Sequence, residues 1–268
     1  MATPALQAAN PLRLPHFRTA EVTIVSLLWL ILSVCGGIYL PPRTGWFVIA
    51  LLMVVYCLFL GRWISARPLG ILVNERNLMS LSRFQMMSWT VLLLSAFFEV
   101  ALKRLHVLSS NSAALPINIS MDWRLWALMG ISATSLVGSP LILSSKTNQE
   151  PQPKTVDKAA AALNEPVVDI QRNSQGTLYS NPRIADASLI DMFQGDEIGN
   201  TAYVDVSKVQ MFYFTIVAVL AYAYALYSAM NDIYPARGFA MPTPSDALVA
   251  LLGISHAAYL TSKTTQHS

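Results

Sequence analysis

Charged residues are scarce in this chain. Asp, Glu, Lys and Arg make up 12% of its 268 residues, whereas a soluble domain has about 25%. The formal net charge of +3 is small and the bases form no single stripe, which argues against nucleic acid as a partner. The apolar fraction of 54% and the mean hydropathy of +0.45 indicate that lipid is the solvent for much of the chain.

Residues typical of enzyme sites are also few. The two cysteines, Cys35 and Cys57, both lie in apolar runs, so neither a disulfide nor a metal framework is expected. The four histidines have no metal-ligand spacing, and no Gly-rich phosphate loop follows a strand. The sequence therefore predicts no enzyme and no cofactor.

Long apolar stretches predict an all-α polytopic membrane protein, because a spanning helix needs about 20 mostly apolar residues. Six segments qualify: Val22–Leu40, Gly45–Leu60, Gln85–Leu105, Trp123–Leu143, Val209–Met230 and Asp246–Thr261. Pro41 and Pro42 end the first helix and force a tight reversal. Asp122 and Ser245 stand where the N-caps of the fourth and sixth helices are expected.

The distribution of Lys and Arg predicts the orientation. Thirteen of the 18 fall in the N-terminal tail, the second and fourth loops and the C-terminal tail, and five fall on the other side. Loops rich in Lys and Arg stay in the cytoplasm. Both termini are therefore expected there.

One unit of sequence occurs twice. Ser82-Arg83-Phe84-Gln85-Met86 is echoed by Ser207-Lys208-Val209-Gln210-Met211, and parts of Leu125–Ser132 recur in Leu248–Ser255 at nearly the same offset. Each unit predicts a short cytoplasmic β-hairpin, with strand-like alternation at 78–82 and 203–207, followed by two membrane helices. Because each unit has an even number of helices, the two units form a parallel internal repeat.

These features predict six regions. They are an N-terminal cytoplasmic tail (1–21), a first transmembrane hairpin (22–63), repeat unit 1 (64–144), a polar acidic cytoplasmic insert (145–194), repeat unit 2 (195–263) and a C-terminal cytoplasmic tail (264–268). Residues 145–208 hold nine acids and six bases, a net charge of −3. Within the insert, helices are expected at Val156–Leu163 and from Asn181-Pro182 onward. An acidic insert of this kind either receives a basic partner or is simply solvated.

Four polar residues in or at the ends of the expected spans are functional candidates, because polar groups are costly in a bilayer. Glu99 is expected to pair with Lys103 at the outer interface, or else to form a proton or cation site. His256 is either a packed histidine or part of a proton relay. Gln85 and Gln210 either tie each hairpin to its helix or face each other and bind a polar solute.

Small residues predict where helices approach closely. Gly130, Thr134 and Gly138 are spaced four apart, and Gly253 is followed by Ala257 at the same spacing. Such faces let membrane helices pack closely. We expect these five residues to pack between helices and to bind nothing.

Four motifs carry a resemblance. They are Ser80–Met86 with Trp89-Thr90, Asp191–Asn200, Val204–Met211 and Leu252–Ala257. They resemble the shared motifs of an uncharacterised family of bacterial multi-pass membrane proteins, over about residues 60–262. The resemblance implies a bacterial inner membrane and carries no activity.

The sequence supports two functions. The first is a non-enzymatic membrane subunit, an anchor or assembly scaffold whose insert faces a cytoplasmic protein partner or a second copy. The alternative is a small-solute or ion transporter or channel, with its path between the two repeat units.

Overall fold

The computed structural model describes residues 19–110, 118–233 and 238–266. This part of the chain folds into eight α-helices: α1 Thr19–Tyr39, α2 Pro42–Ser65, α3 Leu81–Ser110, α4 Trp123–Ser144, α5 Pro153–Leu163, α6 Val167–Asn173, α7 Val206–Ala229 and α8 Asp246–Thr264. Short 3-10 helices occupy Pro68–Leu72, Ile184–Asp186 and Leu189–Met192, and two short strands are β1 Ile119–Ser120 and β2 Phe239–Ala240. Most of the tail predicted at 1–21 lies outside the described residues.

Five helices are long and apolar enough to cross a membrane. They are Ala20–Tyr39, Pro42–Ser65, Leu81–His106, Trp123–Ser144 and Val206–Ala229. The prediction of a helical protein built on membrane-spanning segments is therefore confirmed at this level. The sixth expected span corresponds to α8, which has 19 residues but is not among the five. Its buried face carries Ser255, His256 and Lys263, and these residues lower its hydropathy.

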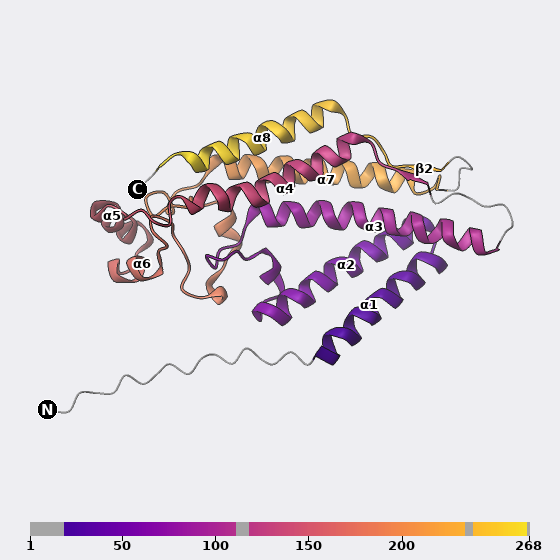
Figure 1. Ribbon diagram of the computed structural model, residues 1–268, viewed down its shortest axis with the longest axis horizontal. Helices are drawn as coiled ribbons and strands as arrows, with labels where there is room; N and C mark the ends of the chain where they lie inside the picture. Colours follow the sequence, from indigo (N-terminus) through magenta and orange to yellow (C-terminus); the bar gives the residue numbers. More distant parts are fainter. Residues whose placement is uncertain (1–18, 111–117, 234–237, 267–268) are drawn as a thin grey trace.

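The long helices form a bundle (Figure 1). Helices α3, α4, α7 and α8 run side by side, and α1 and α2 contact α3 and are inclined to it. Helices α5 and α6 and the C-terminus lie at one end, and β2 lies at the other. We call these the insert end and the strand end. Residues 66–80 and 145–205 cover the insert end and are called the platform.

Two of the expected helix starts are confirmed. The Asp122 carboxylate accepts a hydrogen bond from the backbone N of Arg124 at 2.9 Å, and the Ser245 hydroxyl accepts one from Leu248 N at 3.2 Å. Both bonds satisfy amides that a helix start leaves without an intrahelical partner. Pro41 and Pro42 form the α1–α2 reversal, with Pro42 as the first residue of α2.

The chain forms sheet at the strand end, where none was expected. The reversals before α3 and α7 hold one antiparallel bridge each, Val73–Met79 and Gln194–Val204, while α3 and α7 already begin at Leu81 and Val206. The ends of the two expected strands, at 78–82 and 203–207, therefore belong to the first turns of α3 and α7. Met79 and Leu81 pack into an apolar cluster at this point. The sheet of the described residues is β1 paired in parallel with β2.

The insert folds in part as expected. The helix expected at Val156–Leu163 is present as α5, which packs with α6 against Ile198. The helix expected from Asn181-Pro182 is wrong, because that stretch forms two short 3-10 turns. The Arg67 guanidinium holds these turns by donating to the carbonyl oxygens of residues 184, 185 and 187.

The main apolar core lies between α3, α4, α7 and α8, toward the strand end. Its fully buried members include Trp89, Leu125, Leu128 and Leu226, and Leu252 is nearly so. A second, smaller apolar cluster around Met79, Met192 and Met211 joins the bundle to the platform. Polar side chains occupy the space between these two cores.

Candidate functional site

Gln85 lies at the centre of a buried polar network. Its amide nitrogen donates to the Thr215 hydroxyl at 2.6 Å and lies 2.5 Å from His256 Nε2. On the other side of the ring, His256 Nδ1 lies 2.6 Å from the Ser135 hydroxyl. The four residues come from α3, α7, α8 and α4, so one network joins all four bundle helices. His256 is thus hydrogen-bonded inside the bundle.

Gln210 does not meet Gln85. Its side chain is exposed on α7, whose buried face carries Lys208, Met211 and Thr215 instead. The two glutamines occupy equivalent places in the repeated motif, but α7 turns its glutamine outward. The two glutamines therefore do not face each other. The Gln85 amide does not join a hairpin to its helix either, because it bonds across the bundle.

Glu99 is fully buried beside α1 and α2, and its expected ion pair is absent from the described residues. Lys103 instead donates to the carbonyl oxygens of Ile38, at 3.0 Å, and of Leu40, which belong to the last turn of α1 and the residue after it. Neither oxygen of the Glu99 carboxyl has a hydrogen-bond partner among those residues. Gly45 makes room for the carboxyl, since a Cβ there would lie 2.5 Å from Glu99 Oε1.

The small-residue positions divide into two groups. Gly138 faces Leu260 of α8, and Gly253 faces Ile131 of α4, so these two glycines do lie where α4 and α8 pack. Gly130 and Thr134 are exposed, as is Ala257, so these three do not mediate packing within the bundle. The buried face of α4 carries Ser132, Ser135 and Ser139 instead.

Asp196 forms the second buried polar cluster, at the insert end. Its carboxylate pairs with Arg76 at 2.5 Å, with Lys208 at 3.1 Å and with Lys263. The three cations come from the turn before α3, from α7 and from the end of α8. All three side chains are at least 91% buried, so one carboxylate ties the platform to two bundle helices.

The charges around Asp196 set its ionisation. Burial alone would raise the pKa of the carboxyl, but Lys208, Lys263 and Arg76 outweigh burial and hold the pKa well below its usual range. Asp196 is therefore ionised throughout the physiological pH range. The carboxylate of Asp196 therefore keeps its charge near neutral pH.

Lys146 makes one buried contact within the platform and one to the residue after α8. Its ammonium donates to Glu197 Oε1 at 2.6 Å and to the carbonyl oxygen of Thr265 at 2.6 Å. The ion pair is almost fully buried, with 4% and 3% of the two side chains exposed. The end of α4, the segment before α7 and the end of α8 are thus held together.

Hydroxyl groups bridge the two polar clusters. The Ser82 hydroxyl donates to the Tyr259 oxygen at 3.1 Å, and Tyr259 donates to Ser139 at 3.3 Å. Lys263 lies 4.4 Å from the centroid of the Tyr259 ring. A column of polar side chains therefore runs from the Asp196 cluster to the Gln85 network and ends against the apolar core at Trp89.

Sequence reasoning identified Gln85 and His256 but missed the Asp196 cluster. Asp196 and Lys208 belong to the motifs that carry the family resemblance, but no role was predicted for them. Arg76 and Lys263 contributed only to the count of Lys and Arg that predicts the orientation. The available signal was a basic residue at 208 at the start of an apolar helix, where an unpaired charge is costly. Its partners could not be read from the sequence, because they lie far apart along the chain.

No group of three or more His, Cys, Asp or Glu residues in the described ranges could hold a metal ion. Comparison of the chain with protein-family models, with curated proteins and with solved structures finds no match in any of the three.

Proposed function

We propose that this protein is a non-enzymatic integral membrane subunit, an anchor or assembly scaffold that presents a folded platform at one face of the membrane. The platform carries the proposal, because buried ion pairs fix it to the bundle. Asp196 joins it to α7 and α8 through Lys208 and Lys263, and Lys146 joins it to the residue after α8 through the Thr265 carbonyl oxygen. A segment held at fixed positions can present a surface to a partner at a low cost in conformational entropy.

The platform has exposed apolar side chains suited to contact with protein. Tyr203 and Val204 are 52% and 68% exposed on the reversal before α7. The ammonium of Lys158 lies 5.5 Å from the centroid of the Tyr203 ring, so this surface continues onto α5. Exposed apolar side chains bordered by charge are typical of interaction surfaces, and a partner protein or a second copy would cover them.

The bundle interior supports a scaffold better than a transport path. The polar column reaches Gln85 and then meets the core, where Trp89, Leu125 and Leu226 are fully buried. Among the described residues, these side chains close the strand-end half of the bundle. A path between the units would have to pass through them.

A parallel repeat inserted with the platform in the cytoplasm is part of the proposal. The backbone N of Ser80 donates to Leu72 O at 2.8 Å, and that of Asp205 donates to Phe193 O at 2.7 Å. The donors Ser80 and Asp205 occupy equivalent positions in the two units, although the loops that their bonds close differ in length. Strands β1 and β2, which precede α4 and α8, pair in parallel, and the Lys and Arg distribution supports the orientation. A bacterial inner membrane is the location that the motif resemblance supports.

Purification in mild detergent tests the scaffold. We expect the intact chain to migrate as an assembly larger than its own 29.4 kDa, as measured by light scattering with the detergent mass subtracted. The double substitution Tyr203→Ser with Val204→Ser removes apolar contact area from the platform, so it should shift the protein toward the monomer.

The matched control is Val168→Ser on α6, a site that is 62% exposed and should leave the assembly unchanged. A wild-type protein that is monomeric and has no co-purifying partner would contradict the scaffold. Solute flux into reconstituted vesicles that is lost in Gln85→Leu but kept in Gln210→Leu would favour transport instead.

A further inference from the structure

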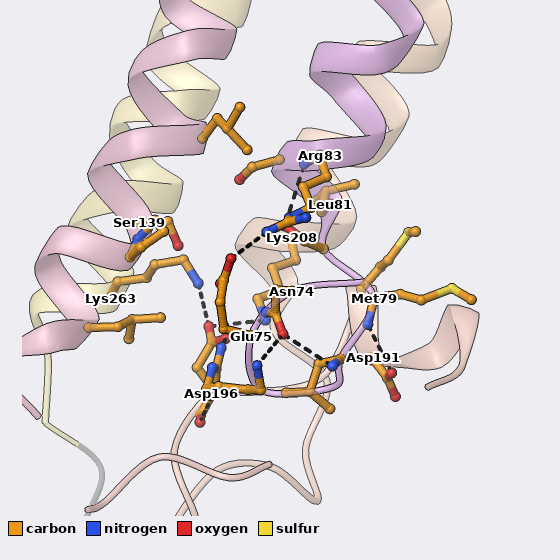
Figure 2. Close-up of a pocket in the computed structure, with 18 of the residues that line it drawn as sticks. Asn74, Glu75, Met79, Leu81, Arg83, Ser139, Asp191, Asp196, Lys208 and Lys263 are labelled. Carbon is orange, nitrogen blue, oxygen red and sulfur yellow. Dashed lines mark hydrogen bonds and ion pairs between the residues drawn. The ribbon is translucent and has the colours of Figure 1, made fainter. Parts of the chain in front are cut away.

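A cavity of about 510 Å³ opens at the insert end of the bundle. It lies between the first turns of α3, the last turns of α4 and the end of α8, and the platform forms its floor. Figure 2 shows Lys263 and Ser139 on one side of this space and Arg83 and Leu81 on the other, with Asp196 at its base. Its volume lies within the range of small-molecule sites.

The side chains that line the cavity include four cations and three carboxylates. Two of the carboxylates are engaged away from the Asp196 cluster. Glu75 pairs with Arg83 at 2.6 Å, and Asp191 accepts from the backbone N of Met79 and of Ser188. Among the described residues, Asp196 is the carboxylate that forms ion pairs with Arg76, Lys208 and Lys263, and the four cations and three carboxylates of the lining give a net charge of +1.

Both lysines retain hydrogen-bonding capacity. An ammonium group has three N–H donors. Within the described residues, Lys208 donates to Gln194 O and contacts Asp196, and Lys263 donates to Asp196. Buried cations in excess of their counter-charges are costly, so this arrangement suits a further anion with acceptor oxygens.

Apolar side chains of α3 and α4 form the opposite wall of the cavity. Met86 and Met87 of α3 face Leu136 and Pro140 of α4, and Pro140 is exposed on the outside of the bundle. The cavity therefore has cations at the insert end and apolar side chains along the membrane-spanning segments. A lipid has the same order of groups, a charged headgroup followed by acyl chains.

We propose that this cavity binds the phosphate of an anionic lipid headgroup, with Lys208, Lys263 and Arg83 as the cationic contacts. Basic pockets between membrane helices bind anionic lipids in this way. A soluble phosphate ester has the same recognition chemistry but would leave the apolar wall unused. The site goes beyond the scaffold proposal and does not depend on it.

Lipid titration of the intact chain in detergent tests the site. The probes are short-chain phosphatidylglycerol, phosphatidylcholine of the same chain length, and inorganic phosphate, with bound lipid counted by native mass spectrometry. We expect phosphatidylglycerol to bind and to raise the thermal unfolding temperature, phosphatidylcholine to do neither, and inorganic phosphate to compete only weakly.

Arg83→Gln is the informative variant, because its side chain is 32% exposed at the cavity and its loss should spare the fold. It should weaken phosphatidylglycerol binding about fivefold, as expected for one partly exposed charged contact. Arg183→Gln, which removes a surface arginine paired with Asp186, should bind like wild type. Equal binding of the two lipids, or wild-type affinity in Arg83→Gln, would overturn the site. Displacement by inorganic phosphate at the lipid's own concentration would overturn the lipid as its occupant.

Discussion

Replacing Asp196 by alanine should cost about 3–5 kcal/mol of unfolding free energy, the usual cost of breaking a buried ion pair. The substitution leaves Arg76, Lys208 and Lys263 buried around no carboxylate. The thermal unfolding temperature in detergent should fall by about 10 °C for a chain of this size. Limited proteolysis should cut first within the platform, because the cluster holds the platform to α7 and α8.

The control for this variant is Asp186→Ala, which breaks an ion pair with Arg183 in the same part of the chain. The Arg183 side chain is 77% exposed, so the loss should be small beside that of Asp196→Ala, because exposed ion pairs contribute little to stability. Adding Lys263→Met to Asp196→Ala should restore part of the stability, since one uncompensated cation is removed. An Asp196→Ala protein that unfolds like wild type would show that the cluster does not hold the platform.

Replacing Lys146 by methionine should also cost about 3–5 kcal/mol, for the same reason. The change removes the lysine from a Glu197 side chain that is 3% exposed, and it leaves the Thr265 carbonyl without that donor. Thermal unfolding in the same detergent measures the loss. Because Glu197 follows Asp196 directly in the chain, the two variants test neighbouring contacts of one platform.

Two further variants serve as the control and as the test of the cause. Arg172→Met breaks the exposed Arg172–Asp169 contact at 4.0 Å and should change stability by less than about 0.5 kcal/mol. The double variant Lys146→Met with Glu197→Met should recover most of the loss, because apolar replacements of similar size often equal a buried ion pair in stability. A single variant as stable as the double one would contradict this reason for the loss, because it would show that removing the lysine from the buried Glu197 carboxylate costs nothing.

Much of the bundle could be predicted because its signals are local. Apolar length identifies a spanning helix, Pro41 and Pro42 end one, and Asp122 and Ser245 bond to amides within three residues of themselves. Each of these effects depends on a single continuous stretch of the chain. Such features are readable from one sequence.

The polar site could not be predicted, because it depends on how helices rotate and meet. Gln85 and Gln210 have matching neighbours in sequence, yet one is buried against Thr215 and the other is exposed. The stretch after Pro182, where a helix was expected, forms short 3-10 turns whose carbonyl groups accept from Arg67, far earlier in the chain. Both cases involve tertiary contacts, and no local pattern records them.

Amide hydrogen exchange of the intact chain in lipid nanodiscs tests most directly whether the platform is a folded structure. The backbone N of Thr177 donates to Lys146 O at 3.2 Å, Tyr179 N donates to Asp196 O at 3.0 Å, and Ile198 N donates to Thr177 O at 2.9 Å. We predict that these amides exchange at least about 100-fold more slowly than an unstructured peptide, as amides in stable structure do. Exchange at the unstructured rate across residues 177–198 would show a free linker and contradict the platform.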